Sequence, residues 1–116
     1  MTDVVETAET LTFTLTWKAM ADVGRNVTTL VHLLDERGNL VAQSDFAPNN
    51  NRFPSQLWQR GDIIIDERIQ PIPADLPSGT YSLHIGLYWS DNITRLPLNL
   101  PTETNTIPIH KLIINY

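Results

Sequence analysis

The stretch that most constrains the fold is residues 76–89, where a Pro-Ser-Gly turn is followed by strict alternation of side-chain type. Successive residues of a β-strand point to opposite faces of a sheet, so every second residue lines one face. Apolar side chains occupy one of these faces at five positions, which are Tyr81, Leu83, Ile85, Leu87 and Trp89. An apolar column of this depth needs a second layer to cover it.

The start of this stretch indicates which two-layer fold to expect. Residues 79–83 read Gly-Thr-Tyr-Ser-Leu, with a tyrosine two residues before a core position. This is the spacing of the corner that opens strand F in immunoglobulin-like sandwiches, where the core position is usually Cys and here is Leu83. We therefore expect the Tyr81 phenol to lock one corner of such a sandwich.

Shorter alternating or β-branched segments occur along the rest of the chain, at residues 11–19, 27–34, 40–45, 62–70, 93–96 and 107–115. Turn residues separate them, as is typical of antiparallel strands. Residues 27–34 are largely apolar on both faces and are predicted to be a central strand; a helix ending at Gly38 is the competing interpretation of the following loop. The sequence predicts an all-β, immunoglobulin-like or fibronectin-like two-sheet antiparallel β-sandwich of seven or eight strands.

The length of 116 residues suits one domain with a single core. We expect residues 1–9, which are polar and acidic, to be a flexible lead-in, and residues 10–116 to be the β-sandwich domain. Residues 46–60 and 97–106 are rich in Pro and Asn or lack alternation, and are expected to be irregular.

Composition excludes several classes of function. The net charge is −5 and the eight Lys and Arg residues are scattered, which opposes binding of nucleic acid because phosphates require a cationic face. Without cysteine there is no disulfide, thiolate nucleophile or Cys-type zinc site. No apolar run approaches the ~20 residues that span a bilayer, so we expect no membrane insertion of this segment.

Seven short segments carry a resemblance to a known family: residues 15–19 (Leu-Thr-Trp-Lys-Ala), 31–35 (Val-His-Leu-Leu-Asp), 38–43 (Gly-Asn-Leu-Val-Ala-Gln), 54–58 (Pro-Ser-Gln-Leu-Trp), 61–62 (Gly-Asp), 76–81 (Leu-Pro-Ser-Gly-Thr-Tyr) and 86–88 (Gly-Leu-Tyr). As an ordered set they resemble a small β-sandwich domain of bacterial proteins, often cyanobacterial or chloroflexal. That domain commonly follows the multi-pass membrane core of mannosyltransferase-like glycosyltransferases.

The resemblance implies an accessory module beside an envelope sugar-transfer enzyme. If the chain is a piece of such an enzyme, it lies on the extracytoplasmic face of the membrane; otherwise it is cytoplasmic. The family has no assigned catalytic residues, so the resemblance implies no catalytic site and no cofactor.

Two aromatic residues are candidates for a sugar-stacking platform. Trp58 lies in the irregular segment and Tyr88 has outward parity in its strand, and an aromatic face packs well on the apolar face of a sugar ring. Polar contacts to such a ligand would come from Asn50, Arg52 and Gln56. The alternative is that Trp58 plugs the open end of the sandwich, and Trp17 and Trp89 have core parity.

Histidines give a weaker candidate for a metal site. His32 and His84 lie in different predicted strands and would approach each other if these strands are neighbours. Such a pair binds a metal or titrates near neutral pH. The simpler interpretation, which we favour, is histidines that are exposed or hydrogen-bonded on a sheet, because no acidic ligand stands at a fixed spacing.

The main acidic cluster comprises Asp45, Asp62, Asp66 and Glu67. Paired carboxylates hydrolyse glycosides or hold calcium. By strand pitch Asp62 and Asp66 lie about 13 Å apart, which is too far for either glycosidase geometry. We therefore interpret these residues as a solvated strand face.

Two functions follow. The favoured one is a non-catalytic accessory module that binds a glycan or a protein partner, such as the membrane glycosyltransferase core. The alternative is a small metal-binding or hydrolytic domain that uses His32, His84 and the acidic strand residues.

Overall fold

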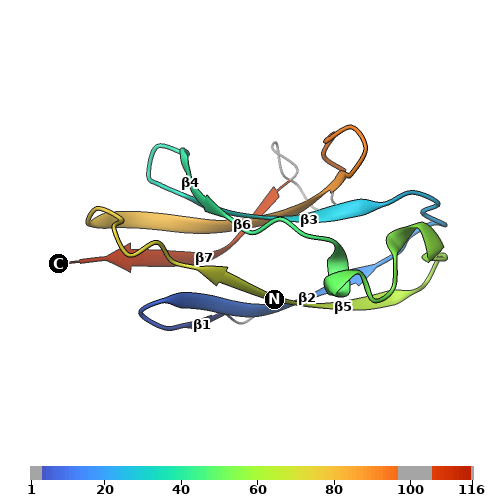
Figure 1. Ribbon diagram of the computed structural model, residues 1–116, viewed down its shortest axis with the longest axis horizontal. Helices are drawn as coiled ribbons and strands as arrows, with labels where there is room; N and C mark the ends of the chain where they lie inside the picture. The colour runs from blue at the N-terminus through green and yellow to red at the C-terminus, as the bar shows by residue number, and fades with distance from the viewer. Residues whose placement is uncertain (1–3, 97–105, 116) are drawn as a thin grey trace.

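The computed structural model describes residues 4–96 and 106–115, which form two stacked antiparallel sheets (Figure 1). The strands are β1 (Val4–Glu6), β2 (Thr10–Lys18), β3 (Val27–Leu34), β4 (Leu40–Gln43), β5 (Ile63–Pro71), β6 (Gly79–Trp89) and β7 (Thr106–Ile114). One sheet has the order β1-β2-β5 and the other has the order β4-β3-β6-β7. The predicted all-β sandwich is confirmed.

Alternation along the strands builds the core between the layers. From the three-stranded sheet, Leu11, Phe13 and Leu15 of β2 point inward and are almost fully buried. They face the column of β6 in which Leu83 and Ile85 are buried. The outward residues of β2 are threonines and a lysine, so burial of one apolar face fixes the register of this strand.

β3 is a central strand, as its apolar faces predict, and it lies between β4 and β6. Its pairing with β6 puts Leu33 opposite Leu83 on the core face and His32 opposite His84 on the outer face. The following loop is a hairpin with Gly38 at φ 81°, and no helix precedes Gly38 within the described residues.

The corner before β6 forms as expected. The Tyr81 hydroxyl donates a 2.6 Å hydrogen bond to the carbonyl oxygen of Pro77, four residues upstream. This bond ties the start of β6 to the connection that leaves β5, and Tyr81 itself is buried in the core.

The N-terminal segment differs from the expected flexible lead-in. Residues 4–6 form β1, which pairs with residues 11–13 of β2. The physical reason is that Val4 packs against the main core cluster, so the segment gains both ladder hydrogen bonds and apolar burial. Residues 1–3 of the lead-in, residues 97–105 of the segment expected to be irregular, and residue 116 lie outside the described part of the chain.

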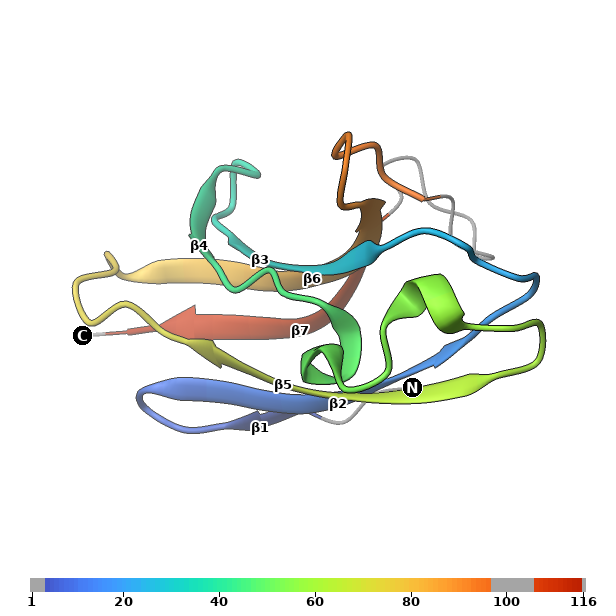
Figure 2. The same ribbon diagram turned by 45° about the vertical axis from the view of Figure 1, so that its right-hand side comes forward.

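Between β4 and β5 the chain crosses from one sheet to the other along one side of the sandwich (Figure 2). This crossing segment, residues 44–62, contains two short 3-10 helices, η1 (Pro48–Asn51) and η2 (Ser55–Leu57). Ser55 fastens it to β3, because its hydroxyl accepts a 2.8 Å hydrogen bond from the Val27 N–H. Across residues 4–96 and 106–115 there is no helix of a length and apolarity that would cross a membrane.

Candidate functional site

The interior of the sandwich is divided into two apolar clusters. The larger cluster includes Phe13, Leu33 and Tyr81. The smaller cluster includes Trp58 and Leu87. Between and beside them lies a cavity of about 980 Å³. Small-molecule sites usually measure about 300–1,000 Å³, so this cavity is at the upper end of their range.

The cavity has walls from both sheets. Its apolar lining residues are Leu15 and Trp17 of β2, Ala19, Met20, Ala21 and Val23 of the segment after β2, Val27 of β3, Ile85, Leu87 and Trp89 of β6, Ile107, Pro108 and Ile109 of β7, together with Trp58 and Leu96. All three tryptophans of the chain are in this set.

Each indole ring is held by a specific contact. The Trp17 Nε1–H donates to Asp66 Oδ2 at 3.2 Å, and the Trp58 Nε1–H donates to the Phe53 carbonyl at 2.8 Å. The ring of Trp89 lies under the Arg25 guanidinium, whose carbon is 4.2 Å from the ring centroid. The aromatic walls are therefore positioned by bonds that do not depend on a ligand.

One side of the cavity is bordered by sheet edges. β1 pairs only with residues 11–13 of β2, so among the described residues the following half of β2 has a strand partner on its β5 side alone. β7 is the edge strand of the opposite sheet, and its residues 107–109 also line the cavity. Both of these edges therefore border the cavity.

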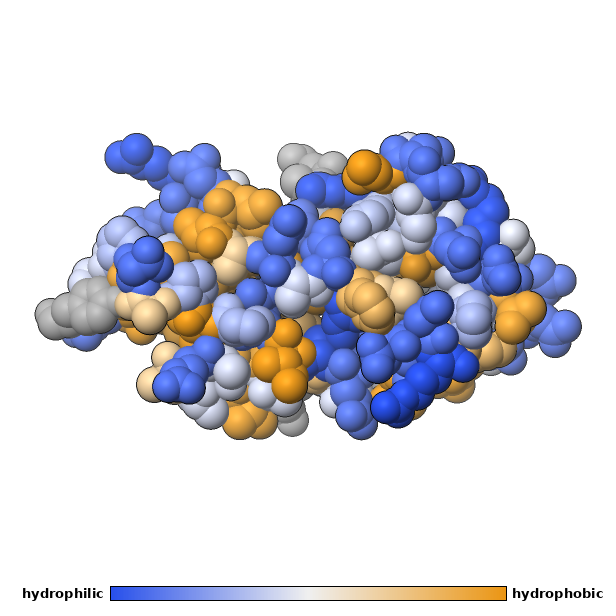
Figure 3. Space-filling model, in the orientation of Figure 1, coloured by the Kyte–Doolittle hydropathy of each residue, from blue (hydrophilic) through white to orange (hydrophobic). Residues whose placement is uncertain are grey.

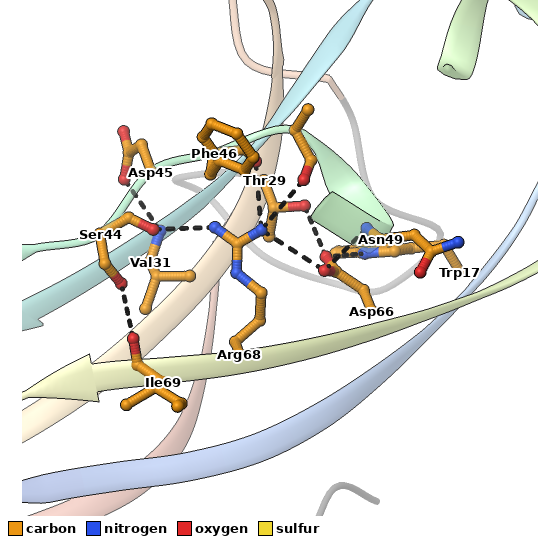
Figure 4. A network of polar contacts seen from close by, with 11 residues as sticks. Trp17, Thr29, Val31, Ser44, Asp45, Phe46, Asn49, Asp66, Arg68 and Ile69 are labelled. Carbon is orange, nitrogen blue, oxygen red and sulfur yellow. Dashed lines mark hydrogen bonds and ion pairs between the residues drawn. The ribbon is translucent and has the colours of Figure 1, made fainter. Parts of the chain in front are cut away.

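A network of buried polar groups joins the two sheets beside the cavity (Figure 4). Asp66 of β5 is 0% exposed, and its carboxylate accepts hydrogen bonds from Thr29 Oγ1 of β3 at 2.8 Å and from the Asn49 N–H at 3.0 Å. The Arg68 guanidinium lies 3.4 Å from Asp66 Oδ1 and donates to the backbone carbonyl of Ser44 at 2.8 Å. The acidic residue is thus fully hydrogen-bonded inside the protein.

This burial corrects the interpretation of the acidic cluster as a solvated strand face. β5 turns Ile64, Asp66, Arg68 and Gln70 inward, and it turns Ile63, Ile65, Glu67 and Ile69 outward. The prediction is wrong for Asp66 because the crossing segment supplies partners to it and to Arg68 that lie 17–24 residues away in sequence.

The expected platform residues are dispersed. Trp58 is only 4% exposed and belongs to the smaller cluster, so the prediction of an exposed stacking surface at this residue is wrong and the plugging interpretation describes it. The indole is buried because its N–H finds a backbone acceptor next to apolar neighbours. Tyr88 faces outward on β6 in the four-stranded sheet, where burial and the nearby charge of Asp45 raise the pKa of Tyr88.

Asn50 and Arg52 do lie together. They line a smaller groove of about 440 Å³ beside β5, with the half-exposed Phe46 and the outward face of Ile69. Figure 3 shows this side of the molecule, where apolar side chains reach the surface in separate patches among polar ones. Gln56 is exposed on η2 and lines neither cavity, and the ligand-binding roles of these residues stay predictions.

The histidine pair is brought together as the strand order predicted, because His32 and His84 are direct partners across β3 and β6. His32 Nε2 lies 3.3 Å from Asp45 Oδ1, and His84 Nε2 lies 2.9 Å from Ser82 Oγ. Among the residues described, however, no group of three or more His, Asp or Glu side chains is arranged to hold a metal ion.

The electrostatics of this outer face follow from burial and hydrogen bonding. Burial alone would raise the pKa of Asp45, but hydrogen bonds with the His32 ring and the Val31 N–H outweigh it and hold that pKa below its ordinary value. Burial and the neighbouring charges of His32 and Arg95 lower the pKa of His84.

Parity along the strands did not reveal the cavity. The parity of Trp17 and Trp89 predicts that both are core residues, but both are only half-buried and line the cavity. Side-chain volume is the signal in the sequence that could have revealed the cavity. Ala19 and Ala21 follow Trp17 at positions where a close-packed core would need larger side chains.

Comparison with protein-family models gives no match to this chain, and comparison with the curated proteins gives none either. Among solved structures, chicken MD-1 complexed with lipid IVa is similar to it, with a TM-score of 0.46 and 12% sequence identity. The similarity covers 82% of this chain and 72% of the MD-1 chain.

Proposed function

We propose that this domain is a binding module that takes an apolar small molecule into the cavity between its two sheets. The observation that carries the proposal is a cavity of about 980 Å³ bordered by every tryptophan of the chain. An open apolar space of this size forfeits dispersion contacts, and an apolar ligand restores them and removes its own surface from water.

The occupant is argued to be a small molecule rather than a protein segment. We place the entrance between the two sheet edges that border the cavity, and the backbone donors and acceptors of these edges are confined to it. Inside the cavity the walls are apolar side chains from four strands, so a flexible hydrocarbon needs no hydrogen-bonding partner there, whereas a peptide that entered the cavity would bury its amide groups unpaired.

A titration with N-phenylnaphthylamine, a neutral apolar fluorophore, tests the proposal. We expect saturable binding with a change in tryptophan emission, and we expect Ala19→Phe to weaken it because the added ring occupies part of the cavity. Thr12→Phe places the same ring on the outward face of β2, the strand that Ala19 follows, and should bind normally. Binding that Ala19→Phe leaves intact would refute the cavity as the site.

A carbohydrate ligand is a second candidate, located at the smaller groove. It is supported by Phe46, which is 53% exposed beside Asn50 and Arg52, since sugars stack on exposed aromatic faces next to polar groups. An oligosaccharide titration followed by NMR should shift resonances of these residues in the wild type but not in Phe46→Ala. Absence of any shift would remove this candidate.

Association with a membrane glycosyltransferase is the third part of the proposal, and it is supported by the sequence resemblance alone. It implies an extracytoplasmic accessory role for the module. Copurification of this chain with a multi-pass membrane enzyme from its native source would support the association, and its isolation free of such enzymes would count against it.

The alternative of a metal-binding or hydrolytic domain has no support in the geometry, because Asp66 is occupied by structural hydrogen bonds.

A further inference from the structure

The charged residues that line the cavity come from one short stretch of the chain, residues 18–25. Lys18 at the end of β2 and Asp22 and Arg25 in the following turn line it, while its remaining lining residues carry no charge. This stretch therefore brings two cationic side chains to the cavity in a protein whose net charge is −5. An apolar cavity whose cationic lining residues all come from this one stretch matches an amphiphile that has an anionic head.

The one acidic residue of this stretch is committed to the backbone. Asp22 Oδ1 accepts a 2.9 Å hydrogen bond from the Arg60 N–H, which fixes the carboxylate on the turn. Lys18 is exposed, and it forms no hydrogen bond or ion pair with any residue that the structure describes. Its ammonium, on a flexible four-carbon stem, is available to an anion in the cavity.

Arg25 is placed to recognise a head group. Its guanidinium lies 4.2 Å from the ring centroid of Trp89, a wall of the cavity, and its Nη2 donates a 2.7 Å hydrogen bond to Asp91 Oδ1. Both side chains of this pair are well exposed, at 44% and 68%, and such surface pairs are weak and exchangeable. A guanidinium carries five N–H donors in a fork that fits carboxylate and phosphate oxygens.

From these positions we infer that the ligand of the cavity is a single-chain anionic amphiphile, whose carboxylate or phosphate head is bound by Arg25 and Lys18 while its hydrocarbon tail lies among the tryptophans. Asp91 occupies Arg25 in the empty protein and gives way when the head group arrives. This inference rests on the proposed apolar cavity and adds the class of its ligand.

Four ligands with one common tail separate the contributions: dodecanoate, dodecyl phosphate, dodecanol and dodecyltrimethylammonium, each titrated below its micelle concentration by tryptophan fluorescence. We expect the two anions to bind about fivefold more tightly than the alcohol, and the cation to bind most weakly. Dodecanoate and dodecyl phosphate distinguish a fatty acid from a phospholipid-like head.

Variants assign the effect to residues. Arg25→Gln should reduce the affinity for the anions to that for dodecanol and leave dodecanol unchanged, whereas Arg37→Gln removes the same charge from the exposed loop after β3 and should change nothing. Asp91→Asn should raise the affinity for the anions about twofold, because it removes the competing carboxylate. A purely structural role of the Arg25–Asp91 pair would not produce this gain.

The outcomes are separable. Equal binding of dodecanoate and dodecanol, or no effect of Arg25→Gln, overturns the inference and leaves the apolar cavity standing. Failure of all four ligands to bind overturns the proposed function as well.

Discussion

At the scale of single residues, Asp66 shows how a charge is accommodated inside this sandwich. Its two carboxylate oxygens receive an indole, a hydroxyl, a backbone N–H and a guanidinium, so no lone pair is left without a partner. A buried ion pair of this kind contributes little net stability, but removing one partner strands the other.

Asp66→Ala is therefore expected to lower the free energy of unfolding by about 3–5 kcal/mol, because Arg68 would keep a buried, uncompensated charge. Urea denaturation measures the effect. Glu67→Ala, the exposed neighbour on the same strand, should change stability by less than about 0.5 kcal/mol. The double variant Asp66→Ala/Arg68→Met should lose less than the sum of its single changes; simple additivity would contradict the network.

His84 predicts a dependence of stability on pH. Its pKa is lowered in the folded protein by burial and by the charges of His32 and Arg95, and its Nδ1 is buried without a hydrogen-bond partner among the described residues. As the pH falls below the ordinary value of 6.5, the unfolded chain therefore takes up a proton first, and stability decreases until the folded histidine titrates too.

The measurement is the free energy of unfolding of the wild type and of His84→Gln between about pH 7 and about pH 5. The variant should lose less stability over this interval. Asp45 does not contribute to the difference, because its pKa is held below 3.8. An equal loss in both proteins would show that His84 is not the group that titrates.

Tyr81 provides a third test at this scale. Tyr81→Phe keeps the buried ring and deletes only the hydroxyl that bonds to the Pro77 carbonyl, so it should cost about 1 kcal/mol of unfolding free energy. Unchanged thermal unfolding would mean that the corner is fixed by the surrounding turn rather than by this bond.

At the scale of elements, β5 is the strand that sequence reasoning places least well. Three of its four isoleucines face outward, whereas its Asp, Arg and Gln face inward, which is the reverse of the usual arrangement. Alternation identified the strand and its two faces, but only the crossing segment decides which face is buried, since it offers Arg68 the backbone carbonyls of Ser44, Phe46 and Ala47. Such non-local partners leave no local pattern in the sequence.

Neighbouring isoleucines of β5 test this orientation. Ile64 is 2% exposed and Ile65 is 48% exposed, so Ile64→Ala should cost about 2–5 kcal/mol and Ile65→Ala less than about 1 kcal/mol. Chemical denaturation of the two variants compares them directly. A larger effect at Ile65 would reverse the assignment of the faces.

At the scale of the whole molecule, alternation and turn chemistry predict the layers, the central position of β3 and the corner at Tyr81. They do not predict the cavity, because its volume depends on the combined size of side chains from four different strands. They also miss β1, a strand of only three residues whose pairing with β2 defines where the proposed entrance begins.

Filling this space should stabilise the protein as a whole. A ligand at one hundred times its dissociation constant should add about 2.7 kcal/mol to the free energy of unfolding, seen as a rise in melting temperature. Without ligand, Ala19→Phe should raise the free energy of unfolding by about 0.5–2 kcal/mol, because its ring occupies part of the cavity, and its melting temperature should rise less with ligand than that of the wild type. An equal ligand-induced rise in this variant would point to a different site.

The Asp66–Thr29 bond has one more consequence, because it spans the gap between the sheets at a length of 2.8 Å. Apolar side chains can shift inward to reduce a cavity, but a hydrogen bond between the two sheets keeps its length. The separation of the two sheets is therefore held without a ligand. We expect association to be limited by diffusion and by the width of the entrance, with no slow conformational opening step before it.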